Sequence, residues 1–182
     1  RRGAMIDYAF HITITDTSVS NFEDDLAQLV ATGHRSLKIF TTYNIQLNDQ
    51  KILKILALAR KYGALVCVHA ENDAIISNAK EQLLSAGRKS PRYHAQSRPR
   101  IAEIEAVERI CQFAQYLDQP VMLFHISTSE SASAVKVAQA RNAPVWAETC
   151  PHYLLMTEDA LDKPGLEGAK FMCSPPQRTT VD

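Results

Sequence analysis

The sequence lacks an excess of either charge, because 20 Lys and Arg residues balance 20 Asp and Glu residues in a chain of 182. Without a basic or acidic field, the composition gives no support to nucleic acid, a membrane surface or an acidic partner as the ligand. No apolar run approaches the length of a membrane span, and no charged start with a following apolar stretch marks a secretory signal. We therefore predict a protein that binds neither nucleic acid nor membrane.

Closely spaced cysteine pairs are also absent, since the four cysteines contain no CxxC spacing. Most of them fall in predicted strands or helices, where a free cysteine behaves as a small hydrophobic residue. This scatter predicts a reduced, cytoplasmic protein, although the sequence does not exclude a disulfide. The four are Cys67, Cys111, Cys150 and Cys173.

Strand and helix patterns alternate along the chain, which indicates βα units around a parallel sheet. An open doubly wound sheet and part of a (β/α)8 barrel both fit this order. No GxGxxG follows the first strand, so a dinucleotide-binding sheet loses support. Strands are predicted at residues 5–8, 36–43, 65–69, 121–125 and 144–148, with a possible sixth at 170–173; helices are predicted at 21–33, 48–63, 74–86, 104–117 and 129–141, with a polar excursion at 88–99.

Three apolar strands carry a basic or metal-ligating side chain. Lys38 lies within one strand, and His69 and His125 end two others. Because alternate residues of a strand share a face, these three side chains could converge at one rim, which favours the barrel. Neutral imidazole binds zinc and similar ions, and a buried lysine with a lowered pKa can react with CO₂ to give a carbamate that bridges two metal ions.

Each of these residues also has a structural explanation. A single histidine at a strand end is commonly a hydrogen-bonded core or rim residue, and Lys38 could extend to solvent or pair with Glu148. The other histidines are predicted not to be ligands, and one run of glutamates is predicted to be a solvated helix face. These residues are His11, His34, His94 and His152, and Glu103, Glu105 and Glu108.

Seven segments, in order across nearly the whole chain, resemble the dihydropyrimidinase/hydantoinase branch of the cyclic amidohydrolases. None of them would suffice alone, but together they are specific. The segments are residues 6–11, 36–43 around Lys38, 68–72 around His69, Ser97-Arg98-Pro99 with Glu103, 125–127 from His125, 148–151, and 173–176 around Ser174.

The resemblance implies a (β/α)8 barrel enzyme with two divalent metal ions, usually zinc, that opens a cyclic amide. Lys38 then matches the carboxylated lysine that bridges both metals, and His69 and His125 match two histidine ligands. Tyr43 matches a tyrosine that hydrogen-bonds the substrate carbonyl and stabilises the oxyanion. Ser174 matches a residue whose backbone holds the cyclic amide. A weaker match, Leu47, lies in a loop that shapes the pocket for the ring substituent.

The implied reaction is attack by a metal-bridging hydroxide on a dihydropyrimidine or 5-substituted hydantoin, which yields an N-carbamoyl amino acid. The sequence departs from the family pattern, because it contains no HxH pair and no catalytic aspartate after Ser174, and Asp182 comes too early. The expected small flanking β-sandwich is also missing. We therefore expect residues 1–182 to be a partial barrel domain, roughly strands three to seven of a longer protein, and inactive alone.

Other functions remain open on the sequence. An allantoinase or dihydroorotase would share the barrel and much of the metal centre, and a substrate panel would separate them. A non-enzymatic scaffold on the same barrel is also possible, although such homologues have lost metal ligands that are retained here. A purely structural role for the fragment is the third reading. The resemblance further implies that the longer protein is a homotetramer.

Overall fold

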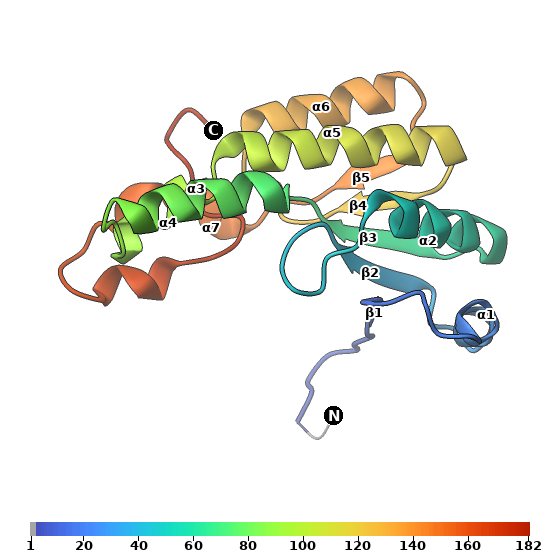
Figure 1. Cartoon of the computed structure of the whole chain (residues 1–182). Helices are drawn as coiled ribbons and strands as arrows, with labels where there is room; N and C mark the ends of the chain where they lie inside the picture. Colours follow the sequence, from blue (N-terminus) through green and yellow to red (C-terminus); the bar gives the residue numbers. More distant parts are fainter. Residues whose placement is uncertain (1–2) are drawn as a thin grey trace.

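A five-stranded parallel sheet forms the centre of the protein, and its strands follow one another in sequence order. The computed structural model describes residues 3–182 (Figure 1). Sequential order differs from a doubly wound sheet, in which the order reverses partway, so the described strands do not support that alternative. The strands are β1 (Ile12–Thr13), β2 (Ser36–Phe40), β3 (Leu65–His69), β4 (Val121–Leu123) and β5 (Val145–Ala147).

Helices between the strands cover one face of the sheet, where α1 contacts α2, α2 contacts α5, and α5 and α6 lie side by side (Figure 1). Two others, α3 and α4, lie together beyond the carboxyl ends of the strands. No helix among residues 3–182 is long and apolar enough to cross a membrane. The helices are α1 (Phe22–Ala31), α2 (Asp49–Tyr62), α3 (Asp73–Ser85), α4 (His94–Ser97), α5 (Arg100–Leu117), α6 (Ser129–Ala140) and α7 (Pro151–Leu155), with 3-10 turns η1 (Pro91–Tyr93), η2 (Glu158–Leu161) and η3 (Glu167–Phe171).

Strand parity divides the sheet into a core face and a site face. Leu37 and Ile39 of β2, like Val66 and Val68 of β3, are fully buried in the same cluster as the apolar stripes of the helices. The residues between them, including Lys38, point to the opposite face. In β2 and β3, every second residue therefore packs in the hydrophobic core, and the residues between them face the candidate site.

Helix α2 begins and ends as its sequence predicts. The Asn48 side chain caps it by accepting a hydrogen bond from the Lys51 N–H at 2.9 Å. Gly63 ends it in the left-handed conformation, with φ 74°, which a glycine adopts without a steric penalty. Strand β3 starts two residues later, so this helix fixes where the strand that carries His69 enters the sheet.

Two predicted strands are wrong. Residues 5–8 are not a strand; Met5 and Ile6 are 97% and 82% exposed, and the first strand is instead the short β1. Residues 170–173 are not a strand either, because Lys170 and Phe171 belong to the 3-10 turn η3. Both segments have an apolar pattern, but neither has a neighbouring strand among residues 3–182 to complete its backbone hydrogen bonds.

Helix α5 offers a test of the core, because it carries one fully buried and one exposed isoleucine. We expect Ile110→Ala to lower the free energy of unfolding by about 2–5 kcal/mol, since it leaves a cavity against the sheet. The matched control, Ile101→Ala, should change it by about 0.5 kcal/mol or less. Urea denaturation followed by circular dichroism measures both, and equal losses would contradict the packing described here.

Candidate metal centre and catalytic site

The candidate site lies at the carboxyl edge of the sheet, on the face without helices. Lys38 is in β2, His69 is the last residue of β3 and pairs in register with Phe40, and His125 follows β4. The structure brings the two histidines together, since His69 Nδ1 and His125 Nε2 are 3.0 Å apart. The sequence-based prediction that these two strand-end residues are neighbours is therefore confirmed.

A buried carboxylate determines which nitrogen of His69 carries the proton. Glu71, with no exposed surface, lies 2.7 Å from His69 Nε2 through its Oε2 atom. Burial raises the pKa of Glu71, but hydrogen bonds from His69 and Arg98 and the Arg98 charge outweigh it and lower the pKa to about 2. An ionised carboxylate only accepts, so Nε2 must donate, and the neutral ring then keeps its lone pair on Nδ1.

His125 completes the pair as a neutral ring. Burial lowers its pKa to about 3, with further contributions from His69 and Lys38. Its Nδ1 atom is buried without a hydrogen-bond partner among the described residues. The backbone has φ 43°, a left-handed conformation that is uncommon for non-glycine residues and concentrates at functional sites.

Lys38 is buried beside the histidine pair, with 8% of its surface exposed. Its Nζ atom makes no hydrogen bond within residues 3–182, so the alternative of an ion pair with Glu148 is not found. The amine instead lies 3.6 Å from the ring centroid of Phe124 and 5.2 Å from that of Phe40. Burial lowers the Lys38 pKa to about 8, against the opposing effect of Cys67 and Glu148.

The histidine pair has donor chemistry that fits a divalent metal ion. Two zinc-bound nitrogens at about 2.0–2.1 Å from a tetrahedral ion are about 3.4 Å from each other, close to the spacing seen here. A carboxylate that accepts from the other nitrogen of a ligating histidine is the usual second layer of such sites. Within residues 3–182, no group of three or more His, Cys, Asp or Glu side chains is placed so that it could hold a metal ion.

Tyr43 faces the same edge from the loop after β2. Its ring centroid lies 5.1 Å from that of His69, and the Arg98 guanidinium carbon lies 5.0 Å from the Tyr43 ring. The backbone has φ 70° and is held by Asp73, which accepts from the Tyr43 N–H at 3.2 Å and from the Thr42 hydroxyl at 2.7 Å. This tether holds the phenol close to the histidines in a backbone conformation that few non-glycine residues adopt.

Ser174 and Leu47, the two other predicted substrate contacts, lie in different surroundings. Residues next to Ser174 are fixed by two hydrogen bonds, from His94 Nε2 to the Cys173 carbonyl at 2.6 Å and from the Tyr153 hydroxyl to the Pro175 carbonyl at 2.7 Å. Leu47 is buried in the hydrophobic core. Substrate contact by either residue stays a prediction.

Glu103 is not on a solvated helix face, as its helical spacing suggested; that prediction is wrong. Only 1% of it is exposed, and its Oε1 accepts from the N–H groups of Ser127 and Thr128 at 3.1 Å each. Both hydroxyls also donate to it. Since Thr128 is the N-cap of α6, Glu103 supports the turn that follows His125.

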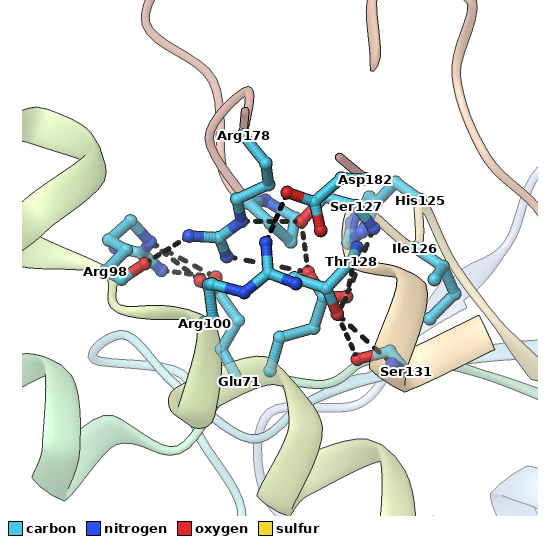
Figure 2. A network of polar contacts seen from close by, with 12 residues as sticks. Glu71, Arg98, Arg100, His125, Ile126, Ser127, Thr128, Ser131, Arg178 and Asp182 are labelled. Atoms are coloured by element: carbon cyan, nitrogen blue, oxygen red, sulfur yellow. Dashed lines mark hydrogen bonds and ion pairs between the residues drawn. The ribbon is translucent and has the colours of Figure 1, made fainter. Parts of the chain in front are cut away.

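A continuous polar network connects this turn to Glu71 (Figure 2). Arg178 lies between the two parts, donating to the Ser127 hydroxyl at 3.0 Å and to the Arg98 carbonyl at 2.6 Å. Sequence analysis missed the roles of Glu71, Arg98 and Arg178. One signal was available for Glu71, because it follows His69 by two residues and so shares its side of an extended chain.

Parallel α/β domains of this class place their functional sites at the carboxyl edge of the sheet. Here Lys38 lies within β2, and the two imidazoles lie at or just beyond the carboxyl ends of β3 and β4. No protein-family model matches the chain. It is 39% identical to a D-phenylhydantoinase of Escherichia coli over 96% of its own length and 38% of that relative's. The chain belongs to the dihydropyrimidinase/hydantoinase family of cyclic amidohydrolases.

Two solved structures agree with this assignment. The D-hydantoinase from a Bacillus species superimposes with a TM-score of 0.94 at 34% identity, covering 98% of this chain and 40% of that one. The dihydropyrimidinase from Brevibacillus agri gives a TM-score of 0.93 at 36% identity, covering 97% and 39%. The chain therefore spans about two fifths of the length of the relatives it matches.

The buried acceptor Glu103 can be tested against an exposed glutamate of the same helix. We expect Glu103→Ala to lower the free energy of unfolding by about 3–5 kcal/mol, because it removes the partner of Arg178 and leaves buried donors of Ser127 and Thr128 unsatisfied. Glu108→Ala should change it by about 0.5 kcal/mol or less. Chemical denaturation compares the two, and a small loss for Glu103→Ala would contradict the assigned network.

The tether between Asp73 and Tyr43 has an unusually close control. Asp73 and Asp49 are both the first residue of a helix and both follow an asparagine cap. We expect Asp73→Ala to increase hydrogen exchange at the Tyr43 amide about tenfold, the loss of roughly one hydrogen bond, while Asp49→Ala leaves that amide unchanged. Exchange measured by NMR tests this, and an unaltered Tyr43 amide in Asp73→Ala would exclude the tether.

Proposed function

We propose that this chain is the central part, roughly strands three to seven, of a (β/α)8 barrel in a longer cyclic amidohydrolase. The substrate would be a dihydropyrimidine or a 5-substituted hydantoin, and the product an N-carbamoyl amino acid. Sequential parallel strands with helices on one face support the barrel, since this is the order of barrel strands. We further propose a cytoplasmic homotetramer.

The observation that carries the proposal is the convergence of His69 Nδ1 and His125 Nε2 at 3.0 Å, with Glu71 holding the His69 proton on the other nitrogen. Lys38, His69 and His125 would hold the metal. When bound, two divalent ions, which we propose to be zinc bridged by carboxylated Lys38, would activate a water and polarise the substrate carbonyl. The Lys38 amine has no hydrogen-bond partner among the described residues, so carboxylation breaks no existing hydrogen bond.

The chain's own residues would bind and orient the ring. Tyr43 would donate its hydroxyl proton in a hydrogen bond to the carbonyl oxygen and stabilise the negative charge that develops there. The backbone of Ser174 would hold the cyclic amide, and the loop with Leu47 would shape the pocket for the ring substituent. Because a positioned donor costs no reorganisation during the reaction, the constrained backbone of Tyr43 supports this role.

Two other functions are less well supported. An allantoinase or dihydroorotase activity would use the same Lys38, His69 and His125, so only a substrate panel separates it. A non-enzymatic scaffold has no need for a lysine and two histidines gathered at one edge with a carboxylate orienting one ring. Their geometry therefore favours the enzyme.

Metal content tests the proposed function directly. The full-length protein, produced with zinc and bicarbonate, should contain two metal ions per chain and hydrolyse dihydrouracil or hydantoin. Lys38→Ala should lose most of the metal. The control Lys54→Ala should retain it, because the Lys54 amine donates a hydrogen bond to the Thr17 carbonyl and takes no part in the candidate site. A well-folded protein without metal would exclude the hydrolase and favour the scaffold.

A hydroxyl deletion tests the role of Tyr43. We expect Tyr43→Phe to lower kcat about 10²–10³-fold with normal metal content, because it removes a donor to the developing oxyanion. Tyr116→Phe, on a side chain that is 79% exposed, should leave kcat unchanged. Steady-state kinetics with elemental analysis distinguishes the two effects, and an unchanged kcat in Tyr43→Phe would assign oxyanion stabilisation to other groups.

A further inference from the structure

Glu71 and Arg98 form a buried ion pair that touches both halves of the site. The Arg98 guanidinium approaches the Glu71 carboxylate through two nitrogens, with Nη2 at 2.6 Å from Oε2 and Nε at 3.0 Å from Oε1. Glu71 is fully buried and Arg98 is 8% exposed. A pair removed from water in this way is costly unless each charge is fully hydrogen-bonded, so its presence at the site calls for a functional explanation.

The two members of this pair have different neighbours. Glu71 accepts from His69 Nε2, on the side of the candidate metal ligands. Arg98 lies over the ring of Tyr43, the candidate oxyanion donor, at a distance that permits a cation–π interaction. One ion pair therefore spans from the histidine that would bind metal to the tyrosine that would bind the carbonyl.

We propose that Glu71 and Arg98 act as one positioning unit, which fixes the donor nitrogen of His69 and the ring of Tyr43 relative to each other. The proposal rests on the proposed function and deepens it, because neither residue touches the reacting atoms. In such a reaction, the distance between metal and oxyanion donor must match the position of the carbonyl oxygen. A rigid link between the two would hold that distance before substrate arrives.

The unit is itself anchored to the sheet and to the carboxyl-terminal segment. The Glu71 N–H donates to the Thr41 hydroxyl at 2.9 Å, and that hydroxyl donates to the Glu71 carbonyl at 2.7 Å. On the other side, the Arg98 carbonyl accepts from Arg178 (Figure 2). Strand β2, the turn after β3 and the residues after Ser174 are thus joined through this pair.

The residue types at both positions are specific to this role. A glutamine at position 71 cannot replace the carboxylate fully, because Oε2 accepts from both His69 Nε2 and Arg98 Nη2 while Oε1 accepts from Arg98 Nε. In either orientation its NH₂ would face a donor, whereas a leucine of similar size would remove the acceptor of His69 Nε2 altogether. A lysine at position 98 keeps the charge but lacks the planar group that stacks on Tyr43.

The tautomer of His69 can be measured without any metal. In two-bond proton–nitrogen NMR spectra of the metal-free full-length protein, at a pH where the ring is neutral, His69 should carry its proton on Nε2. Glu71→Leu, which removes the acceptor, should abolish this preference for the Nε2 proton and weaken zinc binding about 10–100-fold. The matched control is Glu103→Leu, at an equally buried carboxylate beside Arg178, which should lose stability but leave the tautomer unchanged.

The second half of the unit is tested by kinetics. Arg98→Lys should retain the metal at saturating zinc and lower kcat about tenfold, with a smaller effect on KM, since the Tyr43 ring acts on the transition state. The control is Arg109→Lys, because Arg109 also pairs with a glutamate through Nε and Nη2, on the outer helix α5, and should retain full kcat.

The outcomes separate this inference from the proposed function. Wild-type His69 with its proton on Nδ1, or Arg98→Lys with an unchanged kcat in an active enzyme, would overturn the positioning unit and leave the hydrolase intact. A wild-type protein that shows the Nε2 proton but binds no metal and hydrolyses no cyclic amide would instead overturn the proposed function. The NMR result does not depend on folding of any variant, because the wild-type tautomer alone can contradict the inference.

Discussion

The site depends on one fully buried carboxylate. Glu71 stands two residues after the end of β3 with no access to water, so its charge must be balanced by donors from the protein. His69 and Arg98 supply those donors, and in doing so one ring is oriented and one guanidinium is brought over Tyr43. The orientation of the His69 ring and the contact of Arg98 with the candidate oxyanion donor Tyr43 therefore both accompany the satisfaction of a single buried charge.

The sheet makes this arrangement possible by separating packing from chemistry. Apolar residues of one parity, such as Leu37, Val66 and Val121, fill the core under the helices, and the stability of the domain depends on them. The opposite parity carries Lys38 and His69. Because parallel strands end at the same edge, residues more than fifty positions apart in sequence, such as His69 and His125, meet without any distortion of the core.

Sequence predicted the parts of the structure that follow from periodicity and local chemistry. Apolar spacing and turn residues predict the strands that carry Lys38 and His69, the strand that precedes His125 and the helix capped by Asn48. The pairing of the two histidines follows from their places at neighbouring strand ends. Parity alone would put His125 on the core face with Leu123, and its left-handed backbone was not predicted. The failures have a common physical cause. Residues 5–8 have the apolar pattern of a strand but no partner strand among residues 3–182. Glu103 is a residue type that is usually exposed, but it is buried because it accepts hydrogen bonds from the turn after His125. Tertiary contacts, which the local pattern does not show, determine both outcomes. The same reason hid Arg98, whose partners lie far from it in sequence.

X-ray absorption at the zinc edge of the full-length protein tests the central proposal, that His69 and His125 bind a metal ion. We expect a first shell of nitrogen and oxygen at about 2.0–2.1 Å with the outer-shell scattering of imidazole, and a loss of that imidazole signal in His69→Ala. Sulfur scattering at about 2.3 Å would instead assign the metal to the cysteines. A spectrum unchanged by His69→Ala would likewise contradict the account.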